Sequence, residues 1–195
     1  MNYPQAQIGQ LCLPTGQRDP RDTPYRPFKY VDISSVDKDL KAIVQTQEVI
    51  GKDAPSRARK VIAANDVLVS TVRPNLNAVA VVPCELDGEI ASTGFCVLRP
   101  DPTIVNTRYL LYWALTPDFV GYLTARMRGA NYPAVTDAVV RKATIPLPPL
   151  SEQRRIVEIL DQADTLRLVA VTARKTWLRR CVSSCHARSL SSFEV

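Results

Sequence analysis

Short runs of β-branched and other apolar residues mark the first half of the chain. Each run is bounded by Asp, Pro, Asn or Gly. Apolar runs with such boundaries are typical of β-strands. The pattern therefore predicts strands at residues 29–33, 67–72, 78–82 and 92–98.

The spacing of apolar residues becomes helical after residue 106. Apolar and aromatic residues recur with helical spacing over residues 106–128, and Pro117 can open a second helix within this stretch. Further on, Thr136 can cap a short helix that ends near Lys142. Strands first and helices afterwards, without regular alternation of the two, predict an α+β fold rather than a doubly wound parallel sheet.

A proline-rich segment divides the chain into two parts. Residues 145–150 read Ile-Pro-Leu-Pro-Pro-Leu, and prolines so close together prevent a helix and keep the backbone extended. Ser151 then suits a helix N-cap, and Glu152 in the first turn complements the helix dipole. We therefore expect a mixed, β-rich domain at residues 1–150 and a spacer helix with a divergent tail at residues 151–195.

The helix predicted after Ser151 carries one apolar stripe. The stripe has heptad spacing and consists of Ile156, Ile159, Ala163, Leu166, Ala170, Ala173 and Trp177. A lone helix cannot bury such a stripe, so we expect another helix to cover it in a coiled coil. The alternative is that the helix packs on its own domain. From residue 166 onward the composition is poorer for a helix, and we interpret this divergent tail as the remnant of a longer helix.

The composition is that of a folded protein with a modest positive charge. The chain has 195 residues, 46% of them hydrophobic, and its 25 Lys and Arg against 19 Asp and Glu give a net charge of +6. Five scattered cysteines do not suit a disulfide framework. The apolar runs are too short to span a membrane, and no secretory leader pattern is present. We therefore expect a cytoplasmic protein, and the charge favours a polyanionic partner.

The first candidate contact with such a partner is a cluster of three cations. Arg57, Arg59 and Lys60 follow Pro55, which keeps the backbone extended. A cluster of this kind suits contacts with DNA phosphates. The alternative is an ordinary solvated turn.

The turn predicted between two strands carries a second set of polar side chains. Arg73, Asn75 and Asn77 lie in this turn. Arginine can form two hydrogen bonds to guanine and asparagine two to adenine, so these residue types suit the reading of base edges. Asparagine is also common in turns for purely conformational reasons.

A third segment joins the end of the second predicted helix to a loop. Arg128, Asn131 and Tyr132 are its candidates for DNA contact, and Thr93 could add a hydroxyl beside them. The alternatives are an arginine that serves the helix dipole and a strand hydroxyl bonded to the backbone.

Motifs of catalytic chemistry are missing from the sequence. It contains no Gly-rich phosphate loop, no HExxH, no GxSxG and no CxxC pair. Cys181, Cys185 and His186 lack a fourth ligand, so we expect no metal site. An alternative, a compact nuclease, would use two carboxylates and a lysine: Asp32, Asp39 and Lys41. Surface turn residues are the commoner explanation for these three.

The junction after the proline segment resembles a known family. Residues 145–157 closely resemble the junction between a target recognition domain and the following helix in specificity subunits of type I restriction-modification systems. Residues 70–74, 91–95 and 128–133 are similar to segments that recur in those recognition domains. The likeness covers most of the chain and is most specific at the junction.

The resemblance implies a non-catalytic reader of double-stranded DNA. Such subunits direct a methyltransferase subunit and a restriction subunit to a split target. S-adenosylmethionine belongs to the methyltransferase, so this chain is expected to hold no cofactor.

One recognition domain with one helix looks like half of such a subunit. The resemblance therefore implies a homodimer, in which two helices pair through Ile156, Ile159, Ala163 and Leu166. The alternatives are a stand-alone DNA-binding protein and a remnant that no longer assembles.

Overall fold

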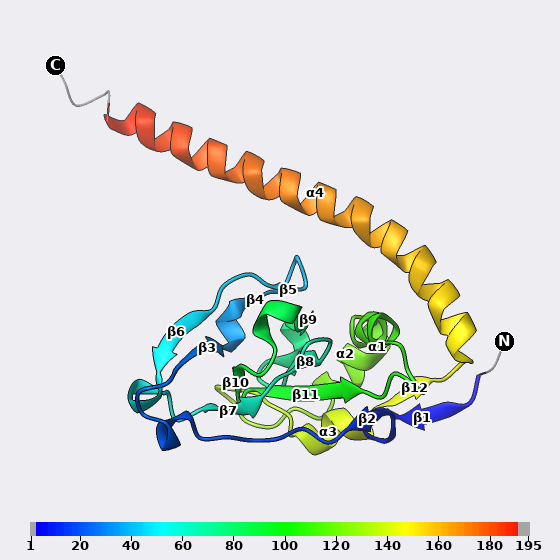
Figure 1. Ribbon diagram of the computed structural model, residues 1–195. Coiled ribbons are helices and arrows are strands. Elements are labelled where there is room, and N and C mark those ends of the chain that lie inside the picture. Colours follow the sequence, from blue (N-terminus) through cyan, green and yellow to red (C-terminus); the bar gives the residue numbers. More distant parts are fainter. Residues whose placement is uncertain (1–2, 191–195) are drawn as a thin grey trace. The chain divides into compact units, whose positions relative to one another are not determined.

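The computed structural model describes residues 3–190, and the chain divides into two compact units, Met1–Val157 and Glu158–Val195. The first unit contains the described strands and three short α-helices (Figure 1). The second contains the greater part of the long helix α4 (Leu150–Leu190). The first unit thus extends beyond the boundary expected at residue 150.

Short strands make up most of the first unit. They are β1 (Gln5–Gln7), β2 (Cys12–Leu13), β3 (Pro27–Val31), β4 (Val36–Asp37), β5 (Ala42–Ile43), β6 (Gln47–Ile50), β7 (Ala58–Val61), β8 (Val67–Ser70), β9 (Val79–Val81), β10 (Ile90–Ser92), β11 (Phe95–Pro100) and β12 (Thr144–Pro146). One four-stranded sheet has the order β6-β3-β10-β7 and the other the order β2-β11-β8-β9. Strand β3 runs parallel to β10, and the other pairs are antiparallel.

The α-helices of the first unit begin at side chains that cap them. The helices are α1 (Thr107–Ala114), α2 (Pro117–Thr124) and α3 (Asp137–Lys142). Asn106, Thr116 and Thr136 accept hydrogen bonds from amides of the first turns. Single 3-10 turns link many strands: η1 (Ile8–Leu11), η2 (Pro20–Asp22), η3 (Ile33–Ser35), η4 (Gly51–Asp53), η5 (Pro74–Leu76) and η6 (Cys84–Leu86).

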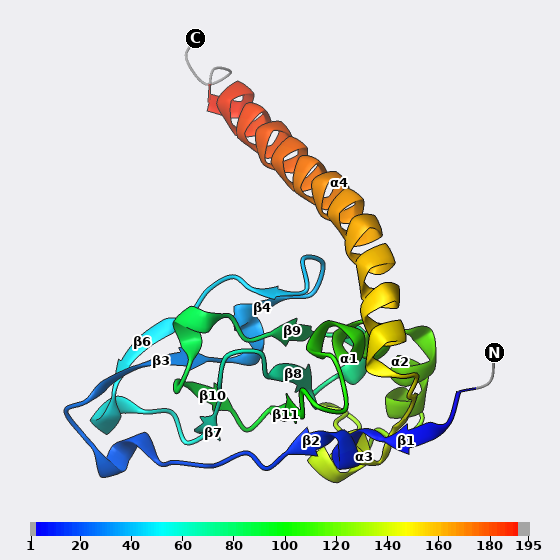
Figure 2. The same ribbon diagram turned by 45° about the vertical axis from the view of Figure 1, so that its right-hand side comes forward.

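The sheet β2-β11-β8-β9 is buried on both faces. On one face, Val67 and Val69 of β8 share a core with the three short helices. On the other, Leu68 packs with Val31 and Ala91 of the first sheet. Figures 1 and 2 show this sheet between the helices and the β6-β3-β10-β7 sheet. Burial on both faces explains why β8 is apolar without alternation.

The α+β class is confirmed, as are the strands predicted at residues 29–33, 67–72 and 78–82. The single strand predicted at 92–98 is wrong. The chain bends at Thr93 and Gly94, so β10 and β11 belong to different sheets. A Cβ at Gly94 would lie 2.6 Å from Cδ1 of Ile33, so a larger residue at the bend would require the Ile33 side chain to move.

Helix α4 continues without a break to Leu190. Residues 166–190, whose composition is less favourable for a helix, are therefore helical as well. Each β-branched residue costs only a few tenths of a kcal/mol in a helix, so a short run of them does not end a long one. Within residues 3–190, no helix has both the length and the apolar character needed to cross a bilayer.

Gln153 fastens the first turns of α4 to the first unit. Its side chain is fully buried, and its Nε2 donates hydrogen bonds to the carbonyls of Ile104 (3.1 Å) and Pro148 (2.9 Å). Its Oε1 accepts one from the amide of Asn106 (2.8 Å). These three bonds join the proline segment, the start of α1 and the start of α4. The compact unit therefore ends inside α4 rather than before it.

The apolar stripe of α4 is divided between the two units. Val157 is buried, and Ile156 packs partly against the helical core of the first unit, which leaves only part of its side chain exposed. Ile159 is 57% exposed and Leu166 73% exposed, and Ala163 between them is exposed as well. The side chain of Trp177 lies outside the described ones.

Replacing Gln153 with alanine is expected to destabilise the protein by about 2–4 kcal/mol, because two carbonyls and one amide lose their partner in a buried place. Urea unfolding of the full chain measures the change. Arg154→Ala is the matched control: this neighbour is exposed, and its loss should cost less than about 0.5 kcal/mol. Equal effects of the two substitutions would contradict the role given to Gln153.

Candidate nucleic-acid interface

Backbone hydrogen bonds bring two of the predicted segments side by side. The amide of Thr93 donates to the carbonyl of Arg57 at 2.8 Å, which joins the start of β7 to the bend between β10 and β11. The next residue, Gly94, accepts hydrogen bonds from the amide (2.8 Å) and the hydroxyl (2.9 Å) of Thr71. The first cationic segment and the end of β8 are thus held to the same bend.

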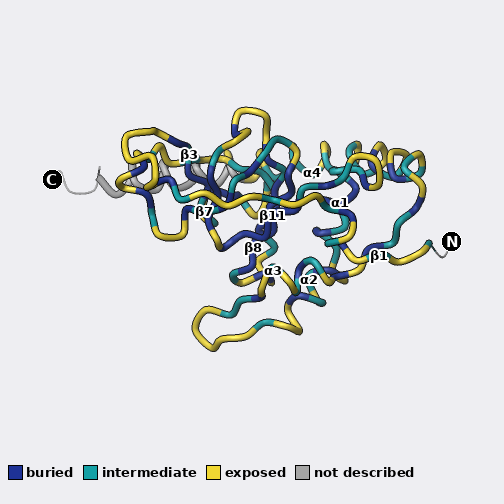
Figure 3. The backbone as a smooth tube through the Cα atoms, turned by 60° about the horizontal axis from the view of Figure 1, so that its bottom comes forward, coloured by how far each residue is buried: buried dark blue, intermediate teal, exposed yellow. Residues whose placement is uncertain are grey.

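The turn after β8 and the loop between α2 and α3 continue this arrangement. The amide of Arg73 donates to the carbonyl of Pro133 (2.8 Å), and the amide of Val135 donates to the carbonyl of Thr71 (2.9 Å). The guanidinium of Arg73 lies over the ring of Tyr132, 5.5 Å from its centroid. Figure 3 shows the α2–α3 loop as a projecting segment that is largely exposed.

Most of the predicted contact residues are exposed on these joined segments. They are Arg57, Arg73, Asn75, Thr93, Arg128, Asn131 and Tyr132. Neither Arg57 nor Arg128 forms an ion pair with another described residue, so both charges are available to a ligand. The arrangement offers guanidinium and amide donors on a frame held by backbone hydrogen bonds.

Lys60 does not fit the prediction of a phosphate contact. It is 8% exposed, its Nζ donates to the carbonyl of Phe95 at 2.5 Å, and it forms an ion pair with the carboxylate of Asp137. Alternate residues of a strand face the same side, and Lys60 shares the inner face of β7 with Ala58, which is fully buried. The prediction is therefore corrected: Lys60 is a buried cation of the fold.

Arg59 is also engaged within the protein. Its Nη1 lies 3.1 Å from Oδ1 of Asp19, and its side chain is about one-fifth exposed. The hydrogen-bonded guanidinium of Arg21 lowers the pKa of Asp19 to about 2, so this carboxylate remains charged at neutral pH. Part of the Arg59 charge is therefore balanced before any ligand arrives.

Asn77 also differs from the expectation that it reads a base. Its Nδ2 points to the carbonyl of Leu115 (3.5 Å), and its Oδ1 is buried without a hydrogen-bond partner among the described residues. Arg73 and Asn77 both adopt the left-handed conformation, with φ of 47° and 49°, on either side of η5. Asn77 therefore shapes the turn, a role that asparagine tolerates better than most residues.

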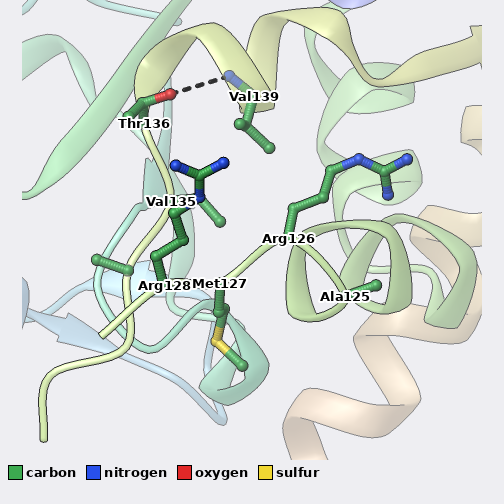
Figure 4. Close-up of a pocket in the computed structure, with 8 residues that line it drawn as sticks. Ala125, Arg126, Met127, Arg128, Val135, Thr136 and Val139 are labelled. Atoms are coloured by element: carbon green, nitrogen blue, oxygen red, sulfur yellow. Dashed lines mark hydrogen bonds between the residues drawn. The ribbon is translucent and has the colours of Figure 1, made fainter. Parts of the chain in front are cut away.

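A groove beside the α2–α3 loop adds a residue that was not predicted. The groove has a volume of about 780 Å³ and an apolar lining that includes Met127, Val135 and Val139. Arg126 and Arg128 lie on either side of it (Figure 4). The guanidinium of Arg126 stacks on the ring of Tyr122, 3.7 Å from its centroid, and remains exposed. Its place two residues before Arg128 was the only signal in the sequence.

Each of the groups considered for catalysis has a structural role or contact in the fold. Asp32 caps η3, the amide of Asp39 bonds to the carboxylate of Asp37, and Nζ of Lys41 donates to the carbonyl of Asn77 at 2.6 Å. No cluster of three His, Cys, Asp or Glu side chains suited to a metal occurs among the residues that the structure describes. The Cys181, Cys185 and His186 side chains lie outside these residues.

The buried thiols do not supply a nucleophile at neutral pH. Burial raises the pKa of the Cys96 thiol to about 12 and that of Cys12 to about 11. Both groups are therefore protonated under ordinary conditions, and a thiol is a much weaker nucleophile than a thiolate.

Comparisons of sequence agree on one family. A family model described as the type I restriction modification DNA specificity domain matches residues 11–175. The type I restriction enzyme HindI specificity subunit of Haemophilus influenzae is 27% identical over 139 residues, which are 65% of this chain and 30% of that protein.

Solved structures give the same picture. The HsdS subunit of Thermoanaerobacter tengcongensis is 41% identical with a TM-score of 0.77, and the match covers 96% of this chain and 46% of that one. A structure reported for complex assembly and conformational transition of the type I R-M system gives 42% identity and the same TM-score. The S subunit of M. genitalium, at 14% identity and a TM-score of 0.54, is similar in fold alone. This chain spans less than half the length of these relatives.

The left-handed turn at Arg73 yields a prediction about stability. Arg73→Gly should change the free energy of unfolding by less than about 0.5 kcal/mol, because relief of the left-handed strain offsets the greater freedom of the unfolded chain. Arg73→Val should destabilise by about 1–2 kcal/mol, since a β-branched residue resists this conformation. Urea unfolding of both variants tests the turn. An unchanged free energy of unfolding for Arg73→Val would show that the left-handed conformation is not required.

Proposed function

The chain belongs to the family of type I restriction-modification DNA specificity domains, and from this membership we propose that its first unit recognises double-stranded DNA. The resemblance predicted from residues 145–157 is thereby confirmed. The observation that carries the proposal is the stacked pair of Arg73 and Tyr132, which lies with Asn75 and Arg128 on two adjoining exposed loops.

The chemistry of these side chains fits contacts with both bases and phosphates. A guanidinium such as that of Arg73 can donate two hydrogen bonds to guanine, and the amide of Asn75 can pair with adenine. Arg57 and Arg126 can neutralise phosphates, which gives affinity without sequence preference. Tyr132 holds the Arg73 guanidinium by cation–π contact and so reduces its freedom before DNA binds.

In the proposed function, the enzymatic reactions on the recognised DNA are catalysed by other subunits. We propose that this chain is the non-catalytic specificity component of a cytoplasmic complex with a methyltransferase subunit and a restriction subunit. In that complex, S-adenosylmethionine would bind to the methyltransferase and not to this chain. Support comes from the specificity subunits named among its relatives and from the structure concerned with type I complex assembly.

We further propose that two copies of this chain pair as a homodimer. In this dimer the exposed part of the α4 stripe, Ile159, Ala163 and Leu166, would meet the same residues of the second chain. Exposed leucine and isoleucine side chains at heptad spacing gain free energy when a second helix covers them.

The recognition proposal predicts distinct effects of two arginines. Wild-type chain, alone or with its methyltransferase subunit, should enrich a defined motif from a randomised duplex pool. Arg73→Ala should relax the preference at one or two positions, at a cost of about 1–3 kcal/mol for the best sequence. Arg57→Ala should weaken binding to all sequences and reduce the slope of log affinity against log salt by about one.

Lys52→Ala is the matched control, because Lys52 is an exposed lysine of η4, outside the joined DNA-facing segments. It should leave motif and salt slope unchanged. The proposal fails if the wild-type chain enriches no motif under either condition, or if all three substitutions act alike.

The dimer proposal predicts that one charge on the stripe separates the two chains. Leu166→Glu should weaken self-association by at least about tenfold in sedimentation equilibrium, since it puts a charge into an apolar contact. Thr172→Glu adds the same charge away from the stripe and should have little effect. A wild-type chain that remains monomeric at high micromolar concentration would contradict the pairing.

A further inference from the structure

We infer that the partly buried ion pair of Lys60 and Asp137 is a clamp between the proposed DNA-facing segments, which carry Arg57, Thr93 and Tyr132. The clamp sets the relative positions of these segments, and base discrimination depends on it. The inference rests on the proposed DNA recognition. Lys60 is a positioning residue in this scheme: its ammonium is inside the protein and touches no ligand.

Three segments meet at the Lys60 ammonium. Lys60 belongs to β7, which directly follows Arg57. Its Nζ donates to the carbonyl of Phe95, the first residue of β11 after the Thr93 bend. Its ion-pair partner, Asp137, is the first residue of α3 and directly follows the loop that carries Tyr132. The Lys60 side chain thus links the strands and the helix next to the segments of Arg57, Thr93 and Tyr132. It does not contact the turn at Arg73.

The ion pair also closes a ring of contacts. Backbone hydrogen bonds join Arg57 to Thr93, Gly94 to Thr71, and Thr71 to Val135. The chain then runs two residues from Val135 to Asp137, and the ion pair returns to β7. Without the pair, the α2–α3 loop would remain attached through Thr71 and Arg73, but its end at α3 would lose its link to β7.

Stability alone is a weak reason for a lysine at this position. Taking an ammonium out of water is costly, and apolar residues of similar size often serve a core as well as an ion pair does. An apolar side chain could not direct a bond to the Phe95 carbonyl and a second one to Asp137 at the same time. The lysine is therefore explained by the defined geometry that it imposes.

The test compares Lys60→Met with the wild-type chain in binding to the selected target and to unrelated duplex DNA. Asp137 is 44% exposed, so water can solvate its carboxylate in the variant. The ratio of target to unrelated affinity should fall by at least about tenfold, because small misplacements of contacting groups are costly. The slope of log affinity against log salt concentration should stay the same, because Lys60 does not contact phosphate in this scheme. Lys60→Arg keeps the cation but changes its shape, so its ratio should fall between those of Lys60→Met and the wild type.

The matched control removes an ion pair elsewhere in the same unit. Arg99 and Asp66 are joined at 2.8 Å, and Arg99→Met breaks this pair, which lies at the opposite end of the β8–β11 strand pair from the bend at Thr93. Arg99→Met should lower the stability of the protein. Under conditions in which each variant is folded, it should leave the ratio of target to unrelated affinity unchanged. The inference is overturned if Lys60→Met keeps the ratio, if Arg99→Met lowers it equally, or if Lys60→Met reduces the salt slope by one, since Lys60 would then touch phosphate itself.

Hydrogen exchange tests the clamp without DNA. In Lys60→Met and in Asp137→Asn, the amides of Thr93 and Val135, which bond across the ring, should exchange at least about tenfold faster. The amide of Val69 within β8 should exchange as in the wild type. Wild-type exchange rates at the amides of Thr93 and Val135 in both variants would overturn the clamp. Faster exchange together with a wild-type chain that prefers no DNA sequence would instead refute the recognition function and leave the clamp as a feature of the fold.

Discussion

The two hydrogen bonds that Thr71 donates to Gly94 join the large sheets where β10 and β11 part. The same residue accepts a hydrogen bond from Val135 through its carbonyl, so the end of β8, the bend and the α2–α3 loop share one point. The side chain of Ile33 packs against Gly94 at this bend, and it would have to move to make room for a Cβ there. The exposed arginines and asparagines owe their proximity to this one crowded junction.

The cations of the first unit fall into two groups according to their partners. Lys60, Arg59 and Arg99 are paired with aspartates, and these pairs tie segments of the fold together. Arg57 and Arg128 are exposed and form no ion pair with a described residue. A net charge alone does not separate these groups, because a paired cation contributes little to the attraction of a polyanion.

The long helix begins as part of one unit and continues as part of another. Gln153, Ile156 and Val157 bind its first turns to the core of the first unit. Beyond them, Ile159 and Leu166 present large apolar surfaces to solvent. The first turns of α4 therefore belong to the compact first unit, whereas the apolar stripe farther along the helix is exposed.

The sequence by itself determined the strands at residues 29–33, 67–72 and 78–82, the helical stretch after residue 106, the cap at Thr136, the proline junction and the family. These depend on local propensity and on residues adjacent in the chain. It also indicated the exposed loops, since arginine and asparagine in turns are rarely buried. The tertiary structure alone decided that residues 92–98 divide between two sheets, that Lys60 and Asn77 face inward, and that Ile156 joins the core. Each of these depends on a partner far away in sequence, such as Ile33, Asp137 or Leu115, and no local pattern records which distant residue will lie there.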